Sequence, residues 1–199
     1  MNYEIEMEKQ MENIPVGTEL LLHACCAPCS SACLERLGNH FKISIFYYNP
    51  NITDKYEYDK RINEIKKFIK SFNTEYPISL IEGNYDPNKF FEITKGLEDE
   101  PERGKRCYKC YNLRLEETAK IAEKLGFSHF TTTLTLSPHK NSNWINEIGE
   151  NLSKKYNTNY LYSDFKKKNG YKRSIELSKE YNLYRQDYCG CIYSKRGNN

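Results

Sequence analysis

The stretch Glu19-Leu-Leu-Leu-His23, followed directly by Ala24-Cys-Cys-Ala-Pro-Cys29, decides the fold that this sequence predicts. The first five residues form a short apolar run of the kind that makes a buried strand. The next six hold three thiols and lead into a helical pattern over Ser30–Leu37. A strand that passes directly into a helix is the repeating unit of α/β proteins.

The rest of the chain continues this alternation. Further strands are expected at Lys42–Tyr48, Ile78–Glu82, His129–Leu136 and Tyr160–Ser163. Helical patterns cover Lys55–Phe72, Pro87–Lys95, Tyr111–Leu125, Ser142–Tyr156 and Arg173–Tyr181, with Asp54 and Gly126 as expected caps. We therefore predict an α/β fold with a mostly parallel sheet flanked by helices, and ligands beyond the carboxyl ends of the strands.

The length of 199 residues suits one compact domain, which we expect over residues 20–199 after an acidic N-terminal extension, residues 1–19. This extension is expected to hold a helix. The sequence shows no apolar run near the ~18 residues that a bilayer crossing needs. It also begins without a basic, apolar leader, so we expect a cytoplasmic protein with no membrane partner.

The charge is uneven along the chain. The net charge is +3, from 30 Lys and Arg against 27 Asp and Glu, but residues 164–199 hold nine basic and four acidic residues, a net +5. Tyrosines are interleaved with these basic residues. Such a segment can follow a nucleic-acid backbone and stack on bases. It can equally be an ordinary solvated surface with half-buried tyrosines, and the composition does not separate the two.

Eight cysteines in a reducing compartment indicate metal or redox chemistry rather than structural disulfides. Cys25, Cys26 and Cys29 enter a helix, whose positive end favours thiolates. Cys107-Tyr-Lys-Cys110 is a C-x-x-C knuckle that grips one metal or one edge of a cluster. Together, Cys25, Cys26 and this knuckle supply four thiolates, which suit a [4Fe–4S] cluster or zinc equally.

Two further segments carry candidate chemistry. Cys189-Gly-Cys191 is predicted to form a redox couple, with metal ligation as the alternative. His139 and Lys140 follow a strand in a turn that faces ligand, where they can donate a proton and contact a phosphate. Cys33 is assigned to packing. Neither a P-loop nor a dinucleotide-binding glycine motif occurs, so we expect no ATP.

Six segments taken together resemble the cobalamin-independent epoxyqueuosine reductase family, QueH. They are Leu22–Cys29, Tyr48–Asn51, Arg106–Arg114, Phe130–Lys140, Asp164–Lys167 and Tyr184–Ser194. The resemblance implies a HUP-like nucleotide-binding α/β fold. It also implies an enzyme that removes the epoxide oxygen of epoxyqueuosine at the tRNA wobble position, without cobalamin.

The resemblance further implies roles for particular residues. Cys25, Cys26, Cys107 and Cys110 would hold a [4Fe–4S] cluster, and Cys29 would bind an additional iron beside it. Cys189 and Cys191 would form a redox-active pair that an external electron donor resets. The proton donor that we expect from the position of the turn, and not from the resemblance, is His139, with a thiol as the alternative. Contacts to the tRNA substrate are expected from Asn49, Asn51, Arg114, Ser137, Lys140 and Arg185.

Two alternatives from other classes stay open. A thiol–disulfide oxidoreductase would use Cys26 and Cys29 alone, because a C-x-x-C pair that opens a helix suits thiol exchange. A zinc-stabilised RNA-binding module would use the same four thiolates without any redox activity.

Overall fold

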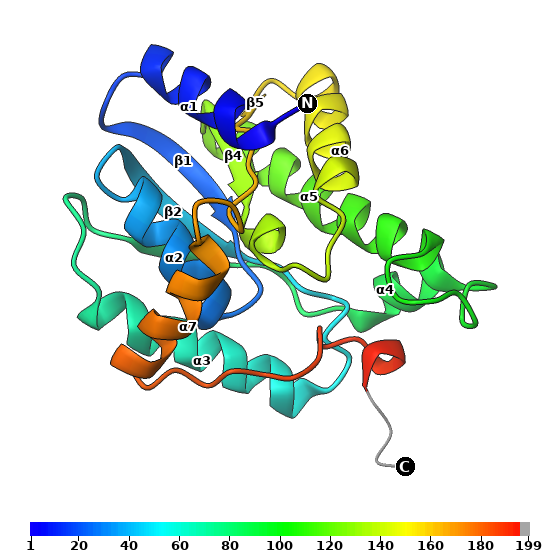
Figure 1. Ribbon diagram of the computed structural model, residues 1–199. Coiled ribbons are helices and arrows are strands. Elements are labelled where there is room, and N and C mark those ends of the chain that lie inside the picture. The colour runs from blue at the N-terminus through cyan, green and yellow to red at the C-terminus, as the bar shows by residue number, and fades with distance from the viewer. Residues whose placement is uncertain (196–199) are drawn as a thin grey trace.

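A computed structural model of the chain describes residues 1–195 (Figure 1). Its centre is a five-stranded sheet in the order β3-β2-β1-β4-β5, and every neighbouring pair is parallel. The strands are β1 (Thr18–His23), β2 (Phe41–Tyr47), β3 (Ser79–Glu82), β4 (His129–Thr132) and β5 (Asn159–Tyr160). The predicted α/β class is thereby confirmed, and the arrangement is compatible with a HUP-like fold.

Helices cover both faces of the sheet (Figure 1). One face packs against α1 (Tyr3–Asn13), α2 (Ala27–Leu37), α3 (Lys55–Ser71) and α7 (Gly170–Glu180). The other packs against α5 (Lys105–Leu125) and α6 (Ser142–Lys155), and α4 (Pro87–Thr94) lies on α5. Alternate residues of β1 point to opposite faces, so Leu20 and Leu22 join the first core and Leu21 joins the second.

The caps that the sequence predicts are present. The Asp54 carboxylate accepts the backbone N–H of Tyr56 at 2.9 Å, which satisfies a free donor at the start of α3. Gly126 ends α5 in the left-handed region at φ +79°. These local signals fix where the two long helices begin and end.

Some element boundaries differ from the prediction. The strand expected to continue to Leu136 ends at Thr132, whose hydroxyl accepts the backbone N–H of Leu134 at 3.1 Å and starts a 3-10 turn, η1 (Thr133–Leu136). The last strand is Asn159–Tyr160 rather than 160–163. Helix α5 begins at Lys105, six residues before the predicted Tyr111, so the C-x-x-C knuckle lies on a helix and not before one.

The N-terminal helix α1 packs on the body of the protein. Met7 is fully buried in the core below this helix. Tyr3 stacks on Tyr162, with 5.7 Å between the ring centroids. Gln10 donates to the carbonyl of Tyr160 at 3.1 Å and accepts the N–H of Tyr162 at 2.9 Å. The side-chain amide thus imitates a neighbouring strand and covers the edge beside β5.

The chain order places a switch point between β1 and β4. After β1 the chain moves toward β3, and it then returns to the other side of β1 to form β4 and β5. A crevice opens at the carboxyl ends of two strands where the winding direction reverses, and ligands of doubly wound sheets bind there. The segments at this position are Ala24–Cys29 after β1 and Ser137–Lys140 after η1.

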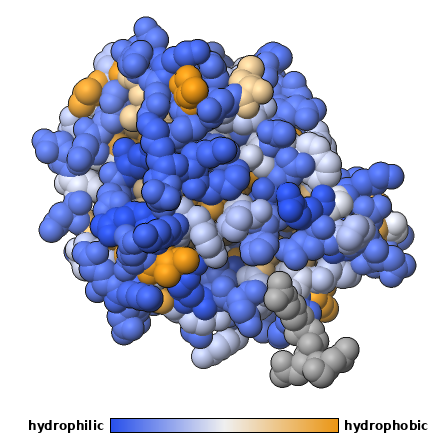
Figure 2. All heavy atoms as spheres, viewed as in Figure 1, coloured by the Kyte–Doolittle hydropathy of each residue, from blue (hydrophilic) through white to orange (hydrophobic). Residues whose placement is uncertain are grey.

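The surface seen in Figure 2 is largely hydrophilic, with hydrophobic atoms only in small separate patches. Among the described residues, no helix combines the length and the apolar character needed to cross a bilayer.

Candidate active site

Three thiols meet where β1 ends and α2 begins. The sulfur atoms of Cys25, Cys26 and Cys29 all lie within 4.8 Å of one another, and those of Cys25 and Cys26 are 3.8 Å apart. Cys26 is the N-cap of α2, and its sulfur accepts the backbone N–H of Cys29 at 3.4 Å. The helix start therefore holds three sulfur ligands at the spacing that a single metal ion requires.

The surroundings of these thiols favour one thiolate. Hydrogen bonds from Cys26 and Cys29, helped by the positive charges of Lys140 and Arg114, hold the pKa of Cys25 well below its usual range. Burial, together with the hydrogen bond to Cys25, raises the pKa of Cys26 to about 12. The thiolate is the form that binds soft metals, so the low pKa of Cys25 favours metal binding by this residue.

A second pair of thiols lies on the first turns of α5. The sulfur of Cys107 accepts the backbone N–H of Arg103 at 3.3 Å, and Cys110 is buried one turn further on. Burial raises the pKa of Cys110 to about 12, which the positive charge of Arg114 partly opposes. Both sulfurs line a small cavity of about 30 Å³, which Cys189 and Cys191 also line.

A third pair of thiols arrives on the C-terminal arm, defined here as residues 182–195. The sulfur of Cys189 accepts the side-chain amide of Asn51 at 3.9 Å, and Cys191 packs against Phe90 and Cys110. Gly190 between them has φ +106°, a conformation that favours glycine. All eight cysteines of the chain lie within the described residues, and each is a free thiol.

The two thiols of the arm differ in acidity. The hydrogen bond from Cys191 holds the pKa of Cys189 well below its usual range, and Lys140 and Arg114 add to this effect. The same hydrogen bond and burial raise the pKa of Cys191. Cys189 is therefore the more acidic thiol of the pair.

Arg114 and Lys140 are cations that lie near thiols from more than one of these three groups. Arg114 is almost fully buried, and burial alone would lower its pKa, but the charges at Cys110, Cys25 and Cys189 raise it. The pKa of Lys140 is raised in the same way, against burial, by Cys25 and Cys189. The two cations favour the thiolate form at Cys25 and Cys189, on two segments that are far apart in the sequence.

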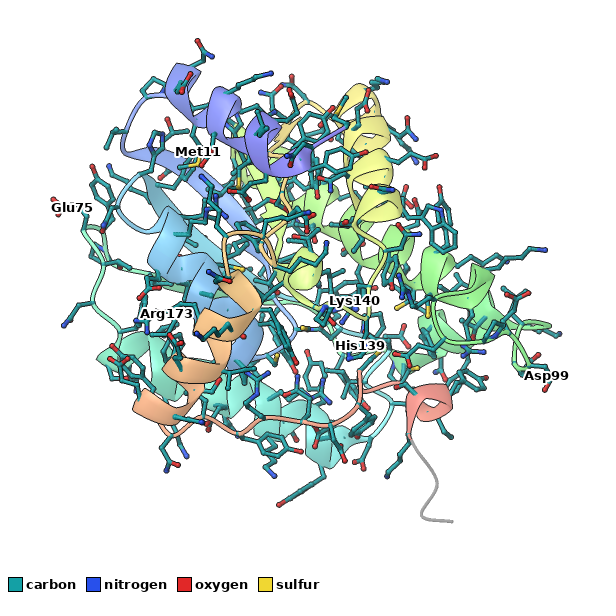
Figure 3. The ribbon with its side chains drawn as sticks, in the orientation of Figure 1. Met11, Glu75, Asp99, His139, Lys140 and Arg173 are labelled. Atoms are coloured by element: carbon teal, nitrogen blue, oxygen red, sulfur yellow. The ribbon has the colours of Figure 1, made fainter. Side chains whose placement is uncertain are left out.

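A larger cleft of about 300 Å³ adjoins the small cavity. Its walls include Cys25, Cys29, Ser137, Tyr171, Arg185 and Tyr188. His139, Lys140 and Cys189 line both spaces, so the cleft and the small cavity meet at these residues. Figure 3 shows His139 and Lys140 near the middle of the molecule, in the region between α7 and the helices α4 and α5.

The structure brings most of the predicted site residues to this cleft and cavity. Those that line one or both are Cys25, Cys29, Cys107, Cys110, Arg114, Ser137, His139, Lys140, Arg185, Cys189 and Cys191. Cys26, Asn49 and Asn51 are buried and are not part of either wall. Cys33 lies in the apolar core between the sheet and α2.

Sequence reasoning missed the buried ion pair of Glu57 and Arg61 on α3. Arg61 lines the cleft, is 1% exposed, and holds the Glu57 carboxylate at 2.7 Å. The sequence did contain a signal for this pair. Arg61 lies on the apolar face of α3 that Tyr58, Ile62 and Ile65 form, and a charge on a buried face needs a buried partner. Glu102, which lines both spaces, and Phe90 were missed as well.

Three basic residues of the segment that begins at residue 164 pair with acids of the same chain. Lys166 bonds to Asp164, Lys168 to Glu8, and Arg173 to Glu35. Tyr181 packs against aromatic rings of α3, whereas Tyr171 and Tyr188 line the cleft. Arg196, which was counted in this segment, lies outside the described residues.

Comparison with known proteins shows which family has sequences similar to this chain. The profile of a family described as "Epoxyqueuosine reductase QueH" matches residues 20–197. A protein of that name from Streptococcus pyogenes serotype M1 is 45% identical over 193 residues, which are 96% of this chain and 76% of the relative. Its namesakes from Staphylococcus epidermidis and Thermotoga maritima are 44% and 36% identical, covering 98% and 90% of this chain and 84% and 91% of the relatives.

Proposed function

Because the chain belongs to the epoxyqueuosine reductase QueH family, we propose that it reduces the epoxide of epoxyqueuosine at the tRNA wobble position, giving queuosine. As a member, the chain is an oxidoreductase. One observation carries the chemical part of the proposal. Thiols from three segments that are far apart in the sequence line adjoining spaces at the switch point of the sheet.

We propose that Cys25, Cys26, Cys107 and Cys110 hold a [4Fe–4S] cluster. The donor set fits the group, because thiolates are its usual ligands and the buried cation Arg114 lies beside both pairs. When bound, such a cluster supplies electrons one at a time. Cys29 has its sulfur within 4.8 Å of Cys25 and Cys26, and we assign it to an additional iron.

Cys189 and Cys191 are proposed to supply the two electrons of the overall reaction. Oxidation of two thiols to a disulfide releases two electrons and two protons. Conversion of an epoxide to an alkene consumes two electrons and two protons and releases water, so the two half-reactions balance. The low pKa of Cys189 makes it the thiolate that begins this oxidation, and an external electron donor then restores the dithiol.

The cleft is proposed to seat the modified base. A base must leave the anticodon stack to reach such a site, and aromatic side chains such as Tyr171 and Tyr188 give it a stacking surface. Ser137, Lys140 and Arg185 offer polar and cationic contacts along the same wall. His139 is exposed at the junction of both spaces and is assigned as the donor of a proton to the leaving oxygen.

Asn49 and Asn51 are proposed to act on the substrate indirectly, whereas Arg114, which lines the small cavity, is proposed to contact it there. Asn49 and Asn51 are buried, and they contact Arg114 and the sulfur of Cys189, respectively. On this proposal they fix the groups that touch the substrate. We also propose a cytoplasmic reaction in which residues 20–199 act as one catalytic domain, since the substrate is a tRNA.

The test is loss of epoxyqueuosine from tRNA with protein purified without oxygen. Cys110→Ala and Cys191→Ala should each abolish turnover, while Cys33→Ala, a buried thiol away from the cleft, should retain it. Full activity of either of the first two variants would reject the assigned roles. A colourless, redox-silent protein would indicate the zinc alternative, and thiol exchange that survives Cys107→Ala would indicate the oxidoreductase that uses Cys26 and Cys29.

A further inference from the structure

Arg61 is a buried cation to which the reaction above assigns no role. It lies on α3, is 1% exposed, and its Nε donates to Oε1 of Glu57, one helical turn earlier, at 2.7 Å. Glu57 is itself 6% exposed. A charge pair held this far from water is costly unless all its donors and acceptors find partners. The partners of the remaining guanidinium donors therefore indicate the role of this ion pair.

Those donors form hydrogen bonds to the backbone of the C-terminal arm. Nη1 donates to the carbonyl of Cys189 at 3.2 Å, and Nη2 donates to the carbonyl of Tyr188 at 3.2 Å. The ring of Tyr188 also lies 5.4 Å from the guanidinium carbon. Only a planar fork with several fixed N–H groups can hold a carboxylate and two consecutive carbonyls together, which is a property of arginine and not of lysine.

Tyr184 provides a second attachment of the arm to α3. Its hydroxyl donates to Glu57 at 3.1 Å, and its backbone N–H donates to the carboxylate of Glu64 at 2.9 Å. The carboxylate of Glu57 thus accepts hydrogen bonds from both Arg61 and Tyr184. The arm is fastened at residue 184 and again at residues 188 and 189, immediately before the thiol pair.

Gly190 fits closely against the same guanidinium. A Cβ atom at this position would lie 3.2 Å from Nη1 of Arg61 and 2.8 Å from Cγ1 of Ile52. The backbone of the Cys189-Gly-Cys191 segment therefore rests directly on Arg61. This contact sets where the chain turns, and so where the sulfurs on either side of the glycine lie.

We propose that Arg61 is a positioning residue, which holds the arm so that the thiols of Cys189 and Cys191 open into the small cavity beside Cys110. The inference deepens the proposed function and rests on the role given there to the dithiol. It requires that Arg61 contribute to turnover through the placement of the arm. Loss of these hydrogen bonds should thus lower kcat while the content of iron stays as it is.

The test compares wild-type protein with Arg61→Lys, which keeps the charge and loses the fork. Amide hydrogen exchange of residues 184–194 should become at least about tenfold faster, as expected when hydrogen bonds from a charged donor are lost. Exchange of β1 and β2 should not change. The kcat for epoxyqueuosine reduction should fall by about tenfold or more, since small misplacements of reacting groups are this costly.

Tyr184→Phe is a milder second variant, which removes only the hydroxyl that bonds Glu57 and should loosen the arm to a smaller extent. Arg36→Lys is the matched control, because Arg36 pairs with Glu4 between α2 and α1 and lies outside the cleft walls. Arm exchange like that of wild type in both Arg61→Lys and Tyr184→Phe would overturn the proposal. So would a loosened arm with unchanged kcat.

Failure of the proposed function would look different. It would appear in the wild-type protein as missing reductase activity, or as full activity in Cys191→Ser. The exchange measurement on Arg61→Lys reports the grip on the arm in either case.

Discussion

Asn49, just beyond the end of β2, accepts a hydrogen bond from Nη2 of Arg114 on α5 at 2.7 Å, and both residues are at most 1% exposed. The amide of Asn49 also donates to the carbonyl of Ala24 at 2.9 Å. One side chain therefore joins the segment that leads into Cys25 with the helix that carries Cys110. This link sets the relative position of the two pairs of proposed cluster ligands.

We predict that Asn49→Ala lowers the free energy of unfolding by about 2–3 kcal/mol, because it leaves a buried guanidinium donor and a buried carbonyl without partners. Chemical denaturation measures this change. Asn159→Ala is the control, since Asn159 is exposed at the start of β5 and should change stability by about 0.5 kcal/mol or less. An effect of Asn49→Ala no larger than that of the control would contradict the link.

Gly190 and Gly126 form a matched pair of left-handed glycines. Gly190→Ala should reduce turnover by about tenfold or more, because the added methyl group meets Ile52 and displaces the thiol arm. Gly126→Ala has open space around its Cβ, so it should cost about 1 kcal/mol of stability and leave kcat unchanged. Equal kcat values for the two variants would show that the placement of the arm does not matter.

The fold could be predicted from the sequence because most of its strands and helices have apolar residues at the spacing typical of the element. The apolar run at Glu19–His23 and the stripe on α3 indicate their elements without reference to the rest of the chain. The edge beside β5 could not be predicted in this way. It is covered by Gln10, a residue about 150 positions away, and periodicity carries no information on such a contact.

Gln10→Ala tests this cover of the sheet edge. The substitution should lower the free energy of unfolding by about 1–2 kcal/mol, the value of two net hydrogen bonds, and should increase aggregation because it exposes edge groups. Thermal unfolding together with light scattering measures both effects. Glu12→Ala, at an exposed position of the same helix, should behave as wild type. Indistinguishable results for the two variants would remove the role given to Gln10.

His139→Asn should lower kcat by about a hundredfold, the usual contribution of a positioned proton donor, with little change in KM for tRNA. His129→Asn is the control, because this histidine bonds to Ser128 at the other end of β4. Steady-state kinetics on epoxyqueuosine tRNA separates the two constants. A wild-type kcat in His139→Asn would assign the proton to another group, and this part of the mechanism would be wrong.

The candidate site was predictable as a set of residue types but not as an arrangement. Thiol motifs at Cys25, Cys107 and Cys189 are visible in the sequence, and the parallel sheet predicts that the first of them lies at a ligand-binding edge. The convergence of the arm depends on Arg61, which donates to backbone carbonyls more than a hundred residues away, and on Glu57, which holds Arg61 in place. Backbone carbonyls have no signature in the sequence, so this contact became visible only in the fold.

The most direct test is the content of iron and acid-labile sulfide in protein purified without oxygen. We predict about four of each per chain in the wild type, the number that a [4Fe–4S] cluster requires, with any excess iron assigned to the site at Cys29. Cys107→Ala and Cys110→Ala should lose most of this iron, and Cys33→Ala should keep it. Wild-type iron and sulfide in both of the first two variants would contradict the central claim that these separated thiols share one inorganic centre.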